Sequence, residues 1–460
     1  MSTALATSSP TSTSKTHAPS APTSVAALAA GAKANRNRAI DFYRAVAMLA
    51  VAIGHWMAMD VALRDGELVA GNALEAAPAM AVMTWLFQVM PLFFVVGGFS
   101  SAMSLDSFTA KAGDDPIRGA RPQDWVIARL RRMLAPTIAL AATWAVPIAG
   151  GFALGQSELI AVGAVAAAIP LWFLANYTID TAIAPYVLPM FRKHPVALPT
   201  IGVTTFALLE VARFAGVPAL PHLNWVLGWL LFQIAGFAWR DGLVPSGRSL
   251  AAIATGFWGL AIAAVTVGPY PVSMVHFPGL ENSPTHPPSL ALMLFGAAYS
   301  ATAILLAPAI SRWLAERPKA WAAVVGANAV AMSVYLWHFT AAIAAAAVFH
   351  MLGWLPTADV GTFAWWLEKL PLMGLAALIL VAIVAKVMPI ERKALLAERH
   401  PFVGGRLAML VLAGVLSTAL KQWAHGDFEI ATACIAVVLV LWHGVIKDNA
   451  LIGRATTRTS

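Results

Sequence analysis

Apolar stretches of about twenty residues recur along this chain from residue 39 almost to its end. A helix needs about 20 apolar residues to cross a bilayer, and only helices or closed barrels can cross it with their backbone groups paired. Charged residues make up 11% of the sequence, whereas a soluble globular domain carries about 25%. The sequence therefore predicts an all-α protein, a polytopic membrane helical bundle.

Twelve membrane spans are expected. The fourth is too long for one straight crossing and contains Pro170 and Pro185, so we expect it to be broken or strongly tilted. The expected spans cover residues 39–60, 79–104, 133–153, 159–191, 198–216, 222–239, 250–268, 288–310, 321–350, 364–386, 407–422 and 430–446.

The basic residues predict the topology. With the N-terminus inside, the cytoplasmic segments hold 25 Lys and Arg residues and the outer ends hold 4. This asymmetry places both termini in the cytoplasm. Alanine-rich, lysine-poor usage favours a bacterial source, and hence the plasma (inner) membrane. The lipid bilayer is an expected partner, whereas no nucleic-acid-binding motif is seen and no nucleic acid is expected.

Three parts are expected along the chain. Residues 1–35 are rich in Ser, Thr, Ala and Pro without an acidic group, which predicts a disordered cytoplasmic tail. Residues 36–400 form the main transmembrane domain. Residues 401–460 add a transmembrane hairpin and a cytoplasmic C-terminal tail. The single cysteine excludes a Cys-rich metal site, and no metal is expected.

The first span carries Arg44 and His55, which are eleven residues apart. Eleven helical residues advance about 16 Å and return to within about 20° of the same face. Asp41 precedes Arg44 by three residues and can hold its guanidinium. Ionisable groups at membrane depth are costly unless they line a cavity, which favours a functional pair. The alternative is an arginine that snorkels to the surface and a histidine that only packs.

This pair suits one type of chemistry. An arginine near the cytoplasm can bind a phosphate or polarise a carbonyl group. A neutral imidazole can accept a proton from a hydroxyl near neutral pH. Together they suggest acyl transfer to an alcohol.

Five stretches of the chain together resemble the integral-membrane acyltransferase 3 family, and they occur in that family's order. They are RNRAIDFYRAVAMLAVAIGHW (36–56), MPLFFVVGGFSSAMSL (90–105), ARLRRMLAP (128–136), PLWFLANY (170–177) and SVYLWHF (333–339). The resemblance implies about ten family helices in residues 36–400, so the last two spans are extra. It also implies a cytoplasmic acyl-CoA donor, as a co-substrate and not a permanently bound cofactor, and a cell-envelope acceptor.

The resemblance assigns roles to the basic residues. It makes His55 the catalytic base and Arg44 its partner in organising the acyl donor. Arg129 and Arg132 form an R-x-x-R pattern that resembles the family's acyl-CoA site. An ordinary cluster of basic residues at the cytoplasmic end of a span is the alternative for this second pair.

The candidates for binding or orienting the substrates are Asp41 and residues of two later motifs, 170–177 and 333–339. Tyr335 and His338 are three apart on one helix, and with Ser333 they are suited to orient the acceptor or His55. Hydrogen bonding between helices is the alternative. Trp172 is a candidate wall of the cavity, or else a core residue.

Three further features leave alternatives open. Gly97 and Gly98 suit close helix packing or a backbone that approaches a ligand. Glu210 and Arg213 are expected to pair with each other. The outer loop 269–287 contains two histidines and a glutamate, which fit a polar surface loop, a contact with an external acceptor, or a metal site.

The function expected is O-acyl transfer. The alternative is a twelve-span secondary transporter or a lipid flippase without such chemistry. The expected enzyme moves a group other than an amino-acyl group, with acetyl-CoA as the expected donor. A glycolipid or polysaccharide of the cell envelope is the expected acceptor. The connection between the second and third spans lacks the short G-x-x-x-D-R motif of the major facilitator superfamily. The two halves of the sequence do not resemble each other, as the repeats of many transporters do.

Overall fold

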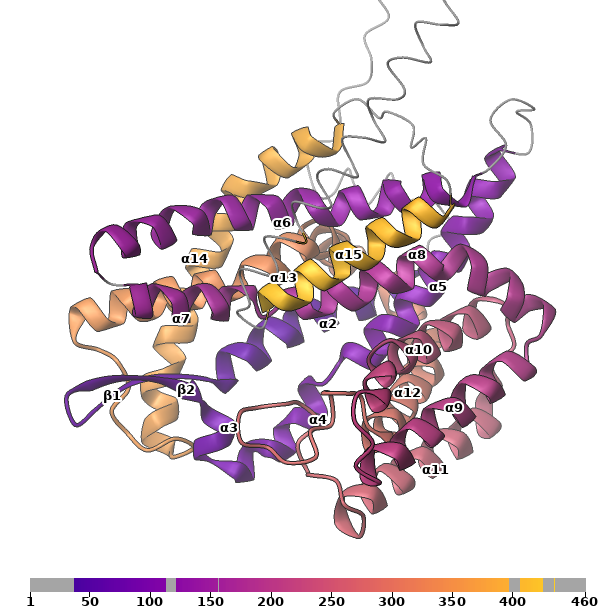
Figure 1. Ribbon diagram of the computed structural model, residues 1–460, viewed down its shortest axis with the longest axis horizontal. Coiled ribbons are helices and arrows are strands. Elements are labelled where there is room, and N and C mark those ends of the chain that lie inside the picture. Colours follow the sequence, from indigo (N-terminus) through magenta and orange to yellow (C-terminus); the bar gives the residue numbers. More distant parts are fainter. Residues whose placement is uncertain (1–36, 113–120, 156, 397–405, 425–433, 435–460) are drawn as a thin grey trace, which may run out of the picture.

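The computed structural model describes residues 37–112, 121–155, 157–396, 406–424 and 434. Long helices form a bundle, and one small antiparallel hairpin lies at its edge (Figure 1). The elements are α2 Arg38–Ala58, β1 Met59–Arg64, β2 Glu67–Asn72, α3 Ala73–Ala76, η1 Pro78–Met83, α4 Thr84–Phe87, α5 Met90–Ala112, α6 Pro122–Ala153, α7 Ser157–Ala168, α8 Leu171–Lys193, α9 Ala197–Phe214, η2 Leu220–Leu223, α10 Asn224–Arg240, α11 Gly247–Thr266, α12 Leu290–Ala315, α13 Pro318–Leu352, α14 Phe363–Leu396 and α15 Arg406–Ala424.

The predicted helical membrane bundle is confirmed. Within the described residues, 8 helical stretches are long and apolar enough to cross a membrane. Two further predicted spans coincide with α2 and with α10, which has 17 residues. The eleventh coincides with α15, whose apolar part is Ala408–Trp423. The twelfth, 430–446, lies outside the described residues apart from residue 434.

The long fourth span is broken at Pro170 but not at Pro185, which lies inside α8. α7 ends at Ala168 and α8 begins at Leu171, with Pro170 between them. A proline has no N–H for the helical hydrogen-bond ladder, and its ring clashes with the preceding turn. The break at Pro170 agrees with this effect, whereas α8 accommodates Pro185 within its length.

The connection after α2 contains the hairpin β1–β2, which was not predicted from the sequence. Asp65 and Gly66 form its turn, with φ of 53° and 84°. Positive φ at both central residues matches the type I′ turn, for which Asp-Gly is a preferred pair. The side chain of Lys369 donates a hydrogen bond to the carbonyl of Met59 and ties α14 to the hairpin.

Small residues let α5 and α10 approach closely. A Cβ atom on Gly98 would overlap the carbonyl oxygen of Gln233, and one on Gly236 would overlap that of Val95. Such contact between small residues is typical of packed membrane helices. Close packing is therefore the role of Gly98, one of the two alternatives left open by the sequence.

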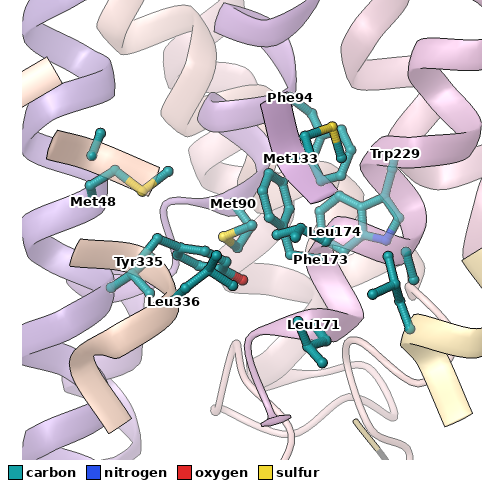
Figure 2. Packing of buried hydrophobic residues seen from close by; sticks show 14 of the residues in the cluster. Met48, Met90, Phe94, Met133, Leu171, Phe173, Leu174, Trp229, Tyr335 and Leu336 are labelled. Atoms are coloured by element: carbon teal, nitrogen blue, oxygen red, sulfur yellow. The ribbon is translucent and has the colours of Figure 1, made fainter. Parts of the chain in front are cut away.

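The core joins buried side chains from α2, α5, α6, α8, α10 and α13 (Figure 2). Phe94 stacks on Trp229 with ring centroids 4.8 Å apart, and Phe173 meets Tyr335 edge to face at 5.4 Å. Aromatic pairs in these geometries add to the stabilisation from burial. This core fixes α8 and α13, which carry two of the five motifs.

Candidate active site

The start of α2 positions the first candidate residues. The side chain of Asn37 accepts a hydrogen bond from the backbone N–H of Ile40 at 3.2 Å and caps the helix. Asp41 then lies in the first turn, and its carboxylate is 3.7 Å from the Arg44 guanidinium. The predicted Asp41–Arg44 pair is therefore present.

Two arginines meet at one serine. Arg44 donates a hydrogen bond to the hydroxyl of Ser100 at 2.7 Å, and Arg129 donates to the carbonyl of the same residue at 3.4 Å. The Arg129 guanidinium lies 4.4 Å from the centroid of the Trp125 ring. Two like charges repel each other at this range, so the arrangement favours a bound anion.

Arg132 belongs to the same region but has a different setting. It is exposed, whereas Arg129 is half-buried. Its charge lies within electrostatic range of Arg129, as does that of Arg44. The R-x-x-R pair thus has one member inside the bundle and one at its surface. Ser100 was not among the residues singled out from the sequence, although it lies in the second motif.

His55 meets His338 from α13. Their Nδ1 and Nε2 atoms are 2.8 Å apart, and their rings stack with centroids separated by 5.0 Å. His338 is 0% exposed, whereas His55 is half-buried. The Trp56 indole donates to the backbone carbonyl of His338 at 2.9 Å, which also holds α2 against α13.

The contacts of His338 determine which nitrogen atoms carry hydrogen. Its Nδ1 lies 2.6 Å from the carbonyl oxygen of Tyr335. A carbonyl only accepts, so this Nδ1 donates, and in the neutral ring Nε2 has a lone pair. His338 Nε2 then accepts from His55 Nδ1, which leaves His55 Nε2 with a free lone pair. The arrangement produces a proton acceptor.

The other candidate residues, from the fourth and ninth predicted spans, have different surroundings. The Tyr335 hydroxyl donates to the carbonyl of Pro170 at 2.7 Å, which ties α13 to the break between α7 and α8. Ser333 is buried. Trp172 is half-buried and packs near Trp229, with ring centroids 5.8 Å apart.

Arg44 and His55 share a helix face but have different neighbours. Arg44 reaches α5 through Ser100, whereas His55 reaches α13 through His338. Their positions on α2 differ by about 16 Å along the axis. One end of this face is therefore suited to binding an anion and the other to accepting a proton.

The outer loop is held by an ionic network. Glu210 and Arg213 pair at 3.6 Å, as predicted, and Arg213 donates to the Ser283 carbonyl at 3.1 Å. Tyr270 donates to Glu210 at 2.8 Å, and burial together with this carboxylate raises the pKa of Tyr270. No group of three His, Cys, Asp or Glu suited to a metal occurs among the described residues.

Comparison with known proteins gives one match. The family model described as an acyltransferase domain, that of the acyltransferase 3 family, matches residues 37–388. This range includes α2, α5, α8 and α13, and it ends before α15. No curated protein and no solved structure matches the chain.

Proposed function

The chain belongs to the acyltransferase 3 family of membrane proteins, and on that premise we propose that it moves an acetyl group from cytoplasmic acetyl-CoA to a hydroxyl of a cell-envelope glycolipid or polysaccharide. The enzyme is a membrane O-acyltransferase for groups other than amino-acyl groups. Acetyl-CoA serves as a co-substrate.

The observation that carries this proposal is the contact between His55 and His338. The buried imidazole of His338 fixes the neighbouring ring and leaves His55 Nε2 free to accept a proton. A half-buried base suits a hydroxyl that enters from the outer side or from the bilayer. His338 acts through His55 and is a positioning residue.

The donor site is supported by the arginines at Ser100. Arg44 and Arg129 can hold a phosphate or the thioester carbonyl at the cytoplasmic part of the bundle. Arg132 at the surface can contact another phosphate of the same donor. Asp41 keeps the Arg44 side chain directed along α2.

The chemical step is direct transfer. His55 Nε2 takes the proton of the acceptor hydroxyl while the oxygen attacks the thioester carbonyl carbon. The carbon–sulfur bond then breaks, and the sulfur of coenzyme A takes the proton from His55. An ester and free coenzyme A result, and His55 returns to its neutral form. No acyl-enzyme is required.

The membrane setting completes the proposal. The excess of Lys and Arg on one side of the spans supports cytoplasmic termini in a bacterial inner membrane. The donor then meets the Arg44 end from the cytoplasm. The acceptor reaches the His55 end from the opposite side.

The test is transfer of labelled acetyl groups by the purified full-length chain in lipid nanodiscs with envelope lipids. His55→Ala should lower the transfer rate by about 10²- to 10⁴-fold, as expected for loss of a general base. His222→Ala, at an exposed histidine, is the matched control and should keep its rate. Transfer by His55→Ala at the unmodified rate would remove the proposal.

The donor site has its own test. An Arg129→Ala/Arg132→Ala double variant should weaken acetyl-CoA binding, measured by calorimetry in nanodiscs. Arg312→Ala/Arg317→Ala is the control, because both arginines are exposed on the same side. Equal binding by both double variants would show that Arg129 and Arg132 are only part of the basic cluster that orients the helix in the membrane. Mass spectrometry of envelope lipids with and without the protein would identify the acceptor.

A further inference from the structure

Helix α15 lies beyond the residues matched by the family model but is part of the bundle. It packs against α8 and also touches α6 and α7 (Figure 1). One face of α15 is buried, with Met409, Leu412, Ala413, Leu416 and Leu420 at most 5% exposed. A helix held only by lipid would not bury such a face, so α15 adds to this particular chain's own core.

The outer end of α15 places a cation on an aromatic ring. The Lys421 ammonium lies 4.6 Å from the ring centroid of Trp225, which follows the first residue of α10. A lysine near the end of a membrane helix ordinarily snorkels to the lipid headgroups. Lys421 is instead half-buried and turned toward another helix of the bundle.

Two histidines of the outer loop complete this group. His286 lies 4.8 Å from Trp225 between ring centroids, and His276 lies 4.6 Å from His286. Both histidines are exposed. We refer to His276, His286, Trp225 and Lys421 as the outer cluster.

The loop that carries the histidines is fixed on α4 by buried hydrogen bonds. The Gln88 side chain donates to the Met274 carbonyl at 2.6 Å, and the Met274 N–H donates to Thr84 at 2.8 Å. The Glu210–Arg213 pair holds the same loop through the Ser283 carbonyl. The histidines therefore have a defined position relative to Trp225.

A series of ring contacts joins the outer cluster to the catalytic pair. Trp225 meets Trp172 with centroids 6.2 Å apart, and Trp172 meets Phe173 at 6.3 Å. Phe173 then meets Tyr335 at 5.4 Å, and Tyr335 meets His338 at 6.0 Å. A continuous series of packed rings thus connects the outer cluster with the catalytic pair.

We propose that the outer cluster binds the acidic group of the acceptor, a sugar that carries a phosphate or a carboxylate, while a hydroxyl of that acceptor reaches His55. This inference rests on the proposed function and specifies its substrate class. An ammonium and two imidazoles can donate hydrogen bonds to an anion, and the buried Trp225 ring holds the ammonium and one imidazole side by side. The extra helix α15 thereby contributes a specificity-determining residue.

The test measures binding and needs no turnover. Glucose 1-phosphate, glucuronic acid and methyl glucoside are titrated into the full-length chain in nanodiscs, and the melting temperature is followed. At least one acidic sugar should stabilise the protein more than the neutral one. Lys421→Met should weaken that binding about tenfold, equal to about 1.4 kcal/mol. Lys421→Arg should retain it.

Control variants make the result decisive. Lys111→Met changes an exposed lysine at the far end of α5 and should bind acidic sugars normally. His55→Ala should also bind them, so loss of transfer is separated from loss of this site. Two results would overturn the inference: equal stabilisation by neutral and acidic sugars, or unchanged acidic-sugar binding in folded Lys421→Met. A preference between the two acidic sugars would identify phosphate or carboxylate as the recognised group.

Discussion

Replacement of His338 by leucine tests the chemical role inferred for the two-histidine contact. Leucine fills much of the buried volume but cannot accept a hydrogen bond from His55 Nδ1. His55 would then lose the partner that selects its tautomer and ring orientation, which lies 2.8 Å away in the structure.

The magnitude follows from this one contact. Loss of a hydrogen-bond partner in a buried setting costs about 1–3 kcal/mol. If this loss falls on the transition state, kcat decreases by about 5- to 160-fold. Among the described residues, His338 has no contact with Arg44 or Arg129. The KM for acetyl-CoA should therefore not change.

The assay is steady-state transfer of labelled acetyl groups, with a thermal melt of each variant as the control for folding. His338→Gln keeps a side-chain acceptor near the position of Nε2 and should restore most of the rate. Full activity in His338→Leu would refute the reasoning. Equal losses in the leucine and glutamine variants would show that the imidazole acts through packing alone.

Three other predictions concern stability and are checked by thermal unfolding in nanodiscs. Gly98→Ala should destabilise the protein by about 1–3 kcal/mol, because its Cβ would overlap a backbone carbonyl of α10. Gly374→Ala is the control, since a Cβ there meets open space. An unchanged melting temperature in Gly98→Ala would contradict the close packing. Arg192→Met should lower stability more than Arg121→Met. Arg192 joins carboxylates of two different elements at 2.7–3.0 Å, whereas the pair of Arg121 with Asp124 lies within one turn of the chain; equal effects would contradict this. Asp180→Leu should raise the melting temperature, because both carboxylate oxygens are buried without a hydrogen-bond partner among the described residues. A lower melting temperature would contradict this and would indicate an ion or water bound to the carboxylate.

Several features of the fold were predictable because they depend on local sequence. The helical spans follow from the length of the apolar stretches, and the broken fourth span follows from Pro170. The Asp41–Arg44 and Glu210–Arg213 pairs follow from a spacing of three on one helix. The hairpin after α2 was not predicted, although Asp65-Gly66 is a turn signal. Its strands have six residues each, and the first follows a long apolar helix directly, so they have no separate hydropathy pattern. The limits of the three predicted parts, 1–35, 36–400 and 401–460, stay predictions.

The sequence by itself determined a membrane helical bundle, the positions of its spans, and a helix with Arg44 and His55 on one face. Only the tertiary structure decided that His55 meets His338, 283 positions away, and that Arg44 and Arg129 share Ser100. It alone placed Lys421 on Trp225. The physical reason is that hydropathy and helical spacing act within one segment. Contacts between segments depend on how each helix rotates and packs, and close approaches such as that of Gly98 to α10 help to set this arrangement.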